Sequence, residues 1–266
     1  MQSINSMGES LLRKEQVEQV FSRYVSPQVA SQAIRDLDNV DSLKLGGRHV
    51  VASVLFADMV GFSSMSEDMT PQEVSSLLNL YFSNIAEVVR FCHGHIDKYM
   101  GDCAMIVFGV PEEYDEHPFK AVACSWMILQ LVELMNRQRI RNGQPVVEFR
   151  IGINSGTMLA GNMGSADRME YTVVGEAVNL ASRLSHAGAP GQVILPGEML
   201  KNPTLSERIT TRTHSTINLR GKKEPVSLFI VEEVKDAFRE EMMQEIRKIL
   251  VRSATITSTN TWRTVR

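Results

Sequence analysis

Apolar residues along this chain recur with two spacings, one helical and one extended. Between residues 74 and 89 they fall at three- and four-residue steps, so they share one face of a helix that ends near Gly94. The sequence Thr-Pro-Gln-Glu at 70–73 is a capping box with proline at the first helical position, which predicts where this helix begins. Residues 49–58 are instead a nearly continuous apolar run, which indicates a buried strand.

Shorter segments of both kinds alternate along the rest of the chain. Further helices are expected at 117–141 and from Gly175-Glu176 through Ala187. The remaining expected strands are 95–100, 103–108, 146–153, 157–161, 170–174, 192–195, 217–219 and 226–232. A turn is expected at Asn154-Ser155-Gly156, between two of these strands. This order implies an α/β (α+β) sandwich, with helices covering one face of a mixed sheet.

The two ends of the chain are expected to lie outside this sandwich. Residues 1–47 favour helix, either as an N-terminal linker or transducer segment or, equally, as helix packed on its own domain. A charged helix is expected over 233–252, exposed to solvent, with partner binding as the alternative. The Ser/Thr-rich residues 253–266 are expected to form a disordered tail.

Composition narrows the class of protein. With 266 residues and 43% hydrophobic content, the chain can form one large domain, or a domain with extensions, around a proper core. Its net charge of −3 gives no general basic surface, so nucleic acid is not an expected partner. The three cysteines are far apart and form no C-x-x-C pair, which favours free thiols in a reducing compartment.

Neither a membrane span nor a signal peptide is expected. No apolar run approaches the roughly 18–20 residues that a span requires, and the N-terminus lacks the apolar core of a signal peptide. A cytoplasmic protein is therefore expected, or one tethered to a membrane or sensor module outside this chain.

Candidate chemistry begins where the first apolar run ends in Asp58. The next residues form a loop that contains Gly61 and Phe62. A strand that ends in an acid before a glycine turn can hold a cation on the carboxylate and phosphate oxygens on the freed N–H groups. Asp is also favoured at turns for its own reasons, so a turn or helix-capping role explains Asp58 equally well at this point.

A second acid, Asp102, lies at the tip of the hairpin expected over 95–108. A sheet could place it beside the end of the first strand, where two carboxylates would suit two Mg²⁺ ions in a phosphoryl displacement. Taken singly, Asp102 is also well explained as a turn residue.

A third stretch places Asn179 and Arg183 one helical turn apart, so they share a face. An amide beside a guanidinium suits a sugar oxygen and a phosphate. By spacing alone, a solvated Arg183 with a polar neighbour is the simpler interpretation.

Together, these stretches resemble the class III nucleotidyl cyclases. The motifs that carry the resemblance are Phe56-x-Asp58-x-x-Gly61-Phe62-Ser63, Lys98-x-x-Gly101-Asp102 and Tyr171-Thr172-x-x-Gly175-x-x-Val178-Asn179-x-Ala181-x-Arg183. Each motif is weak alone, but three in order at family-like spacing are highly specific. The resemblance covers 48–232, which would be the catalytic domain, and is nearest to bacterial adenylyl cyclases with Lys and Thr at the base-reading positions.

The resemblance implies a ferredoxin-like palm fold with a mixed sheet, working as a head-to-tail homodimer with its active sites between the subunits. One chain would hold two Mg²⁺ ions, or Mn²⁺ in their place, through Asp58, Asp102 and the carbonyl of Met59. The backbone N–H groups of the same chain's glycine loop would face the triphosphate. That loop consists of Val60, Gly61, Phe62 and Ser63.

The partner chain would supply the rest of each site. Lys98 and Thr172 resemble the pair that reads adenine, where guanylyl cyclases of the family usually carry Glu and Cys. Asn179 would orient the ribose, and Arg183 would bind the α-phosphate. Finally, Arg220 stands where the family often has a triphosphate-binding Lys, with Lys222 as a rival for that role.

The function implied is an adenylate cyclase that converts ATP to 3′,5′-cyclic AMP and pyrophosphate in signal transduction. A guanylate cyclase and a non-catalytic nucleotide-sensing pseudocyclase are the alternatives, although pseudocyclases have usually lost an aspartate or the arginine that this chain retains. Residues 20–29 resemble the linker that precedes many bacterial cyclase domains, so an upstream sensor or regulatory module is an expected partner.

Overall fold

The computed structural model describes residues 46–165, 167–218 and 225–261. The helices expected before residue 46, the candidate phosphate ligand Arg220 and its rival Lys222 lie outside the described residues, as do residues 262–266.

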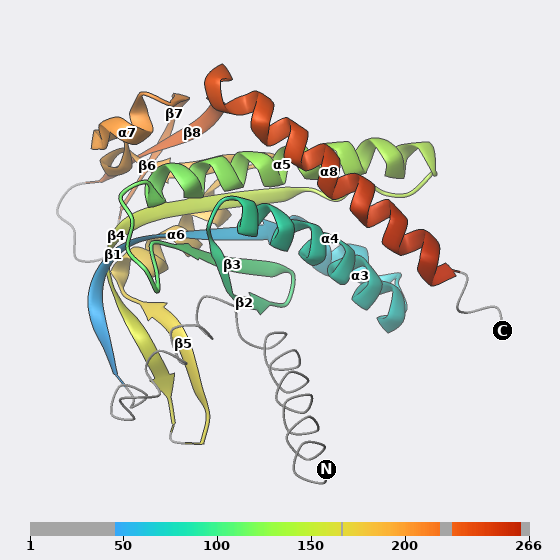
Figure 1. Cartoon of the computed structure of the whole chain (residues 1–266), viewed down its shortest axis with the longest axis horizontal. Coiled ribbons are helices and arrows are strands. Elements are labelled where there is room, and N and C mark those ends of the chain that lie inside the picture. Colours follow the sequence, from blue (N-terminus) through green and yellow to red (C-terminus); the bar gives the residue numbers. More distant parts are fainter. Residues whose placement is uncertain (1–45, 166, 219–224, 262–266) are drawn as a thin grey trace, which may run out of the picture. The chain divides into compact units, whose positions relative to one another are not determined.

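A mixed eight-stranded sheet is the frame of the described structure (Figure 1). Its strands are β1 (Gly46–Met59), β2 (His95–Met100), β3 (Cys103–Phe108), β4 (Phe149–Gly164), β5 (Met169–Val174), β6 (Val193–Pro196), β7 (Ile209–Ile217) and β8 (Val226–Val234). They lie in the order β2-β3-β1-β4-β6-β8-β7, and β5 pairs with β4. The β4–β6 pair is parallel, whereas β1–β3, β2–β3, β6–β8 and β7–β8 are antiparallel.

The chain divides into two compact units. The described part of the larger unit comprises residues 49–159, 173–218 and 225–261 and contains every described helix. The described part of the smaller unit comprises residues 46–48, 160–165 and 167–172, which include the start of β1, the end of β4 and most of β5.

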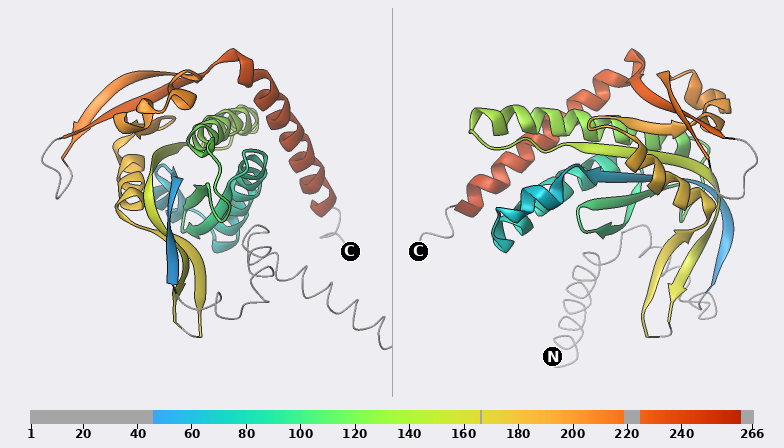
Figure 2. Two further views of the ribbon diagram at one scale, coloured as in Figure 1. Left: turned by 60° about the vertical axis from the view of Figure 1, so that its left-hand side comes forward. Right: turned by 180° about the vertical axis from the view of Figure 1, so that it is seen from behind.

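Helices cover both faces of the sheet in the larger unit. They are α3 (Phe62–Glu67), α4 (Pro71–Phe91), α5 (His117–Arg141), α6 (Glu176–Ala187), α7 (Pro203–Ser206) and α8 (Asp236–Thr261), with a 3₁₀ turn η3 (Gly197–Lys201). Figure 2 shows α4, α5 and α8 on one face and α6 on the other. The α+β class is as predicted, but α6 departs from the expectation that all helices share one face.

The apolar run of β1 is buried on both faces, as its lack of alternation predicts. Leu55, Ala57 and Met59 belong to the core under α4 and α5. Val54 and Phe56 point to the opposite face and are also buried. Burial on both faces holds β1 in the interior of the sheet. It therefore also determines the position of Asp58, at the end of the apolar run.

Helix α4 begins as its capping box predicts. The Glu73 N–H donates to Thr70 Oγ1 at 3.3 Å, and the Thr70 N–H donates to Glu73 Oε2 at 2.8 Å. These two bonds satisfy backbone N–H groups at the start of the helix that have no acceptor within the helix itself.

Strand β4 corrects the sequence analysis. The expected turn at Asn154-Ser155-Gly156 is wrong, because β4 runs through these residues without a break. The Asn154 side chain donates from Nδ2 to the Ala177 carbonyl at 3.0 Å, so it bonds to α6 and not to its own turn. A turn-forming residue is accommodated in a strand when a neighbouring element supplies its partner.

The C-terminal helix α8 corrects two expectations. It is not a solvated helix, since Met242, Ile246 and Ile249 are buried in the core with α4 and α5. It also continues to Thr261, so residues 253–261 are not the disordered tail that their composition suggested. Asn84 of α4 donates to Ser253 Oγ at 3.2 Å, which ties this part of the helix to the core.

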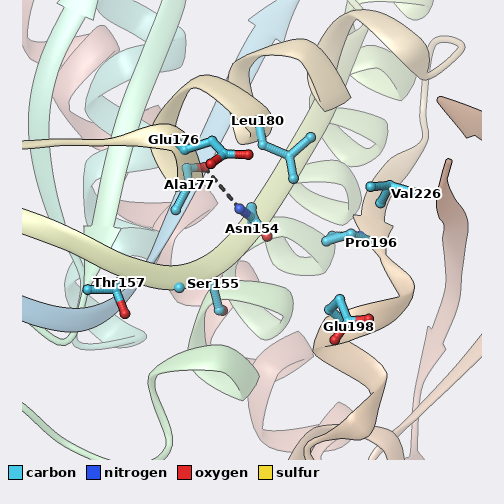
Figure 3. Close-up of a pocket in the computed structure, with 10 residues that line it drawn as sticks. Asn154, Ser155, Thr157, Glu176, Ala177, Leu180, Pro196, Glu198 and Val226 are labelled. Carbon is cyan, nitrogen blue, oxygen red and sulfur yellow. Dashed lines mark hydrogen bonds between the residues drawn. The ribbon is translucent and has the colours of Figure 1, made fainter. Parts of the chain in front are cut away.

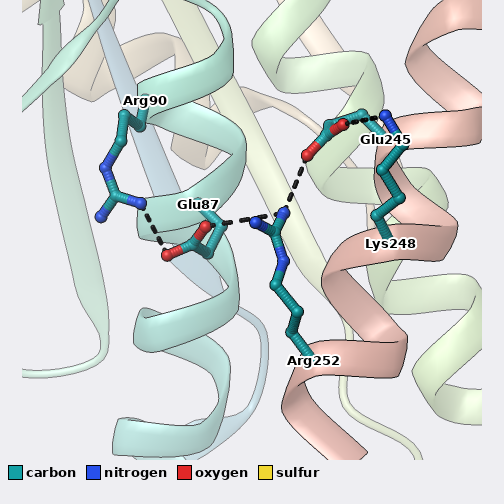
Figure 4. Close-up of polar contacts among 5 residues, drawn as sticks. All are labelled: Glu87, Arg90, Glu245, Lys248 and Arg252. Carbon is teal, nitrogen blue, oxygen red and sulfur yellow. Dashed lines mark hydrogen bonds and ion pairs between the residues drawn. The ribbon is translucent and has the colours of Figure 1, made fainter.

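Ion pairs line the contact between α4 and α8 (Figure 4). Arg252 Nη2 lies 2.8 Å from Glu245 Oε1 on its own helix and 3.8 Å from Glu87 Oε2 on α4. Exposed pairs of this kind contribute about 0–1 kcal/mol each, so the buried apolar residues of α8 supply most of its attachment.

Helix α5 is long and apolar enough to cross a membrane by length and composition, which the sequence analysis did not anticipate. Its most apolar window is 67% buried within the structure. The packing of α5 against α4, α8 and the sheet accounts for this apolar character. All three cysteines are free, as expected.

Candidate active site

The structure brings Asp58 and Asp102 together. Asp58 lies near the end of β1 and pairs in register with Cys103, the first residue of β3. Asp102 immediately precedes Cys103 in the β2–β3 turn. The N–H of Met59 donates to the Asp102 carbonyl at 3.4 Å, so the end of β1 is bonded directly to the β2–β3 turn.

This pair of acids forms a negatively charged, partly buried site. The Asp58 side chain is 11% exposed. Burial raises the pKa of the Asp102 carboxyl above its ordinary value, and the nearby charge of Asp58 adds to the rise. A bound cation would relieve both effects.

The donor set fits Mg²⁺. This ion takes oxygen ligands and is commonly held by one or two carboxylates together with substrate phosphates. Asp58 and Asp102 supply such carboxylates, and Met59, whose carbonyl is the third candidate ligand, follows Asp58 in the chain. Among the described residues, no cluster of three or more His, Cys, Asp or Glu offers an alternative metal site.

The glycine loop turns the chain from β1 into α3. Gly61 has a φ of 68°, the left-handed conformation that glycine adopts without steric cost. One donor of the expected triphosphate cradle, however, has a partner within the chain. The Val60 N–H donates to the Glu148 carbonyl at 2.8 Å, so this donor is already engaged. The backbone N–H groups of Gly61, Phe62 and Ser63 remain the candidates.

The base-reading candidates lie on two strands. Lys98 is on β2, just after a bulge, with Nζ 3.3 Å from Oδ1 of the buried Asp97. Thr172 is on β5 in the smaller unit and is buried, with 7% of its surface exposed.

Helix α6 presents Asn179 and Arg183 on one exposed face, as their spacing predicts. Its opposite face is buried through Leu180 and Leu184. The helix lies against β4 at Gly152, where a Cβ atom would collide with the backbone of Ala181 and Ser185. A glycine is therefore required for this close helix–strand packing.

Sequence reasoning missed two residues at the acid pair. Arg150 of β4 donates from Nε to Asp58 Oδ2 at 2.7 Å, and its Nη2 lies 3.0 Å from Nδ1 of His186 on α6. The only sequence signal for Arg150 is a charged residue within the strand expected over 146–153.

A cavity of about 240 Å³ opens beside α6 (Figure 3). It is lined by β4, α6, the end of β6, η3 and the start of β8, and Glu176 and Glu198 supply its carboxylates. Ser155 at its wall bonds to Ser53, whose hydroxyl lies 2.8 Å from Nδ1 of the buried His117. The predicted site residues do not line this cavity.

The fold and the paired acids define an α+β palm domain with a candidate cation site. Comparison with known proteins identifies its family: residues 47–233 match the adenylate and guanylate cyclase catalytic domain. The chain therefore belongs to the class III nucleotidyl cyclases, and the resemblance and fold class predicted from the sequence are confirmed.

Solved structures of both substrate classes are similar to this chain. A crystal structure of the guanylyl cyclase Cya2 has a TM-score of 0.68 and 33% sequence identity, and the match covers 73% of this chain and 98% of that one. A crystal structure of the adenylyl cyclase CyaB from P. aeruginosa also has a TM-score of 0.68, with 30% identity over 72% and 98% of the two chains.

Curated relatives are longer than this chain. An uncharacterized protein of Mycobacterium tuberculosis is 32% identical over 228 residues, which are 85% of this chain and 40% of that protein. The same figures hold for an uncharacterized protein of Mycobacterium bovis. The chain thus spans about 40% of the length of the curated relatives that it matches.

Proposed function

We propose that this chain is an adenylate cyclase that converts ATP to 3′,5′-cyclic AMP and pyrophosphate at sites shared across a homodimer. The observation that carries the proposal is the convergence of Asp58 and Asp102 at adjacent strand ends in a domain of the cyclase family. Both acids and the arginine of the family pattern are retained, which favours an active enzyme over a pseudocyclase.

Each group of the site has a distinct task in this proposal. Asp58, Asp102 and the Met59 carbonyl hold two divalent ions, Mg²⁺ or Mn²⁺. When bound, these ions supply Lewis-acid activation of the ribose 3′-hydroxyl and neutralise charge on the triphosphate. The N–H groups at Gly61 to Ser63 and the side chain of Arg220 bind the triphosphate.

The reaction is an in-line displacement within one nucleotide. The 3′-oxygen forms a bond to the α-phosphorus. The bond between that phosphorus and the oxygen that bridges the α- and β-phosphates breaks, and pyrophosphate leaves. The hydroxyl proton passes to Asp58, to water or to the substrate. Asn179 of the partner subunit orients the ribose, and Arg183 of the partner subunit stabilises charge that develops at the α-phosphate.

The choice of ATP over GTP is carried by two residues. The ammonium of Lys98 can donate to adenine N1, and the hydroxyl of Thr172 can accept from the 6-amino group. The similar solved structures include both a guanylyl and an adenylyl cyclase, so overall similarity does not discriminate between the substrates. Guanylate cyclase is therefore the second candidate function.

The cellular setting is proposed by analogy with the longer relatives. A domain that spans about 40% of such proteins suits the output end of a sensor, so we place it in the cytoplasm, regulated by an upstream module.

A direct assay discriminates these candidates. Purified protein is incubated with ATP or GTP and Mg²⁺ or Mn²⁺, and cyclic nucleotide is measured. The proposal expects cyclic AMP with a higher kcat/KM for ATP than for GTP. Formation of cyclic GMP without cyclic AMP would indicate a guanylate cyclase. A dimeric sample that leaves both nucleotides intact would indicate a pseudocyclase.

A further inference from the structure

The cavity beside α6 lies where one of two parallel strands ends. Strand β6 pairs with β4 at Ile151 and Gly152, and it then ends at Pro196, before η3 begins. Strand β4 continues to Gly164, and its residues 154–157 line the cavity together with Pro196. The carboxyl ends of parallel strands are a common place for ligands in α/β sheets. The position of the cavity in the sheet thus favours a ligand site.

The cavity contains a buried hydrogen-bond acceptor without a donor. Asn154 of β4 is only 6% exposed, and its Nδ2 donates to the Ala177 carbonyl at 3.0 Å. Because a carbonyl oxygen only accepts, this bond also fixes which end of the amide is the nitrogen. Figure 3 shows this nitrogen facing α6, with the amide oxygen turned away from the helix. No donor among the described residues contacts Oδ1, so a ligand that donates to it satisfies an unpaired polar group.

The charge of the lining is negative. Glu176, on the first turn of α6, is exposed and has no ion-pair partner among the described residues. Glu198 of η3 is paired with Lys201, whose Nζ lies 2.8 Å from its Oε2. Neither lysine nor arginine occurs among the described residues that line the cavity. This lining therefore favours a cation over an anion.

Ser155 adds a second uncharged acceptor. Its hydroxyl bonds to the hydroxyl of Ser53, which lies 2.8 Å from Nδ1 of His117. Burial lowers the pKa of His117, so this imidazole is neutral near pH 7 and adds no charge that would repel a cation. Whichever hydroxyl donates, the oxygen of Ser155 keeps at least one lone pair for a donor in the cavity.

The remaining lining is apolar and suits a carbon chain. We call Leu180, Pro196 and Val226, which lie on α6, β6 and β8, the apolar wall. The cavity of about 240 Å³ is far larger than the roughly 10–15 Å³ that one water molecule requires. It is slightly smaller than the pockets of roughly 300–1,000 Å³ that hold drug-sized ligands. A small organic molecule therefore fits the cavity better than a bare ion.

We propose that this cavity binds a small organic cation, namely a primary ammonium group on a short alkyl chain. The three N–H groups of the ammonium match the acceptors at Asn154 Oδ1, Ser155 Oγ and the Glu176 carboxylate. The alkyl chain lies along the apolar wall. This binding site goes beyond the proposed function, because none of the predicted catalytic, metal, base or phosphate residues that the structure describes lines the cavity.

Methyl NMR on the whole chain tests the proposal at the cavity itself. The methyl groups of Leu180 and Val226 are labelled with carbon-13, and their signals are followed during titration with n-butylammonium chloride. Matched probes are 1-butanol, which keeps the chain without the charge, and sodium butyrate, which reverses the charge. The variants are Glu176→Gln and Ser155→Ala. The matched control is Glu241→Gln, at an exposed carboxylate of α8 that does not line the cavity.

We expect saturable shifts of both methyl signals with n-butylammonium, and much weaker binding of 1-butanol and butyrate. Glu176→Gln removes the charge partner and should raise Kd about fivefold, the upper end for an exposed ion pair. Ser155→Ala removes an acceptor from a charged donor and should raise Kd roughly tenfold. Glu241→Gln should match wild type.

The absence of saturable shifts at both methyl signals with n-butylammonium would overturn the proposal. Equal affinity for 1-butanol, or higher affinity for butyrate, would show that the cavity does not select a cation. A wild-type Kd in both variants would show that these acceptors do not hold the ammonium. If Ser155→Ala does not fold, the exposed substitution Glu176→Gln decides alone. Because the readout is binding, a chain without cyclase activity would refute the proposed function and leave this test unchanged.

Discussion

In the proposed enzyme, substrate choice depends on Lys98 and Thr172. Lys98 follows the β2 bulge, and Thr172 is a buried hydroxyl on β5. Both groups match adenine in hydrogen-bond polarity, whereas glutamate and cysteine at these positions would suit guanine. Because similar structures include both cyclase classes, the identity of these side chains carries the argument for ATP.

The double substitution Lys98→Glu with Thr172→Cys tests this assignment. A glutamate cannot donate to adenine N1 and leaves a buried acceptor unpaired, which costs about 1–3 kcal/mol, or roughly 10–100-fold in kcat/KM for ATP. We expect the ratio of kcat/KM values to move towards GTP. Lys235→Glu, an exposed change of equal charge, is the control and should leave the ratio unchanged. An unaltered ratio in the double variant would refute the assignment.

At the same scale, local sequence predicted the acids but not their neighbours. Asp58 and Asp102 could be placed together because a strand end and a hairpin turn are short-range patterns. Arg150 could not be found, since its contact joins residues 92 positions apart. The engaged N–H of Val60 was missed for a similar reason, because its acceptor Glu148 precedes a distant strand.

Elements were predictable where local chemistry fixes them. The capping box of α4 gave its first residue, and the unbroken apolar run gave β1 as a buried strand. Strand β4 was divided wrongly, because the partner of Asn154 lies on α6. The buried face of α8 was hidden among charges, and only its packing on α4 and α5 reveals it.

The contact between α6 and β4 yields a prediction at this scale. Gly152→Ala places a methyl group against the backbone of α6, which must shift and carry Asn179 and Arg183 with it. We expect a loss of about 1–3 kcal/mol in the free energy of unfolding and a fall in kcat. Urea denaturation and initial rates measure the two effects.

Gly156→Ala is the matched control on the same strand, because its new methyl would lie 3.3 Å from one side-chain atom, the Cβ of Ala177. It should be much milder in both measurements. Equal stability and equal activity in Gly152→Ala and wild type would show that α6 does not depend on this close approach.

The folded domain includes residues beyond those that match the cyclase family. The cyclase family covers residues 47–233, whereas α8 begins at Asp236 and packs into the same core as α4 and α5. The helix is therefore part of the folded domain.

The composition of the chain limited the classes of protein to which it could belong. No pattern within one chain, however, could reveal which groups of the proposed shared site come from a second copy.

In the proposed enzyme, each site combines the acids of one chain with Asn179 and Arg183 of another. Asp58→Ala removes a metal ligand and should abolish turnover, while Arg183→Ala should lower kcat by roughly 10²–10³-fold. In a mixed dimer of these two variants, one cleft carries both defects and the other carries neither.

The most direct measurement is cyclic AMP formation by the two variants, alone and after mixing under conditions that exchange subunits. Size-exclusion chromatography checks that each variant and the mixture remain dimeric. Mixing is expected to restore a substantial part of the wild-type rate. A mixture that stays as inactive as its separate components, while dimers exchange freely, would contradict the proposal of a shared site.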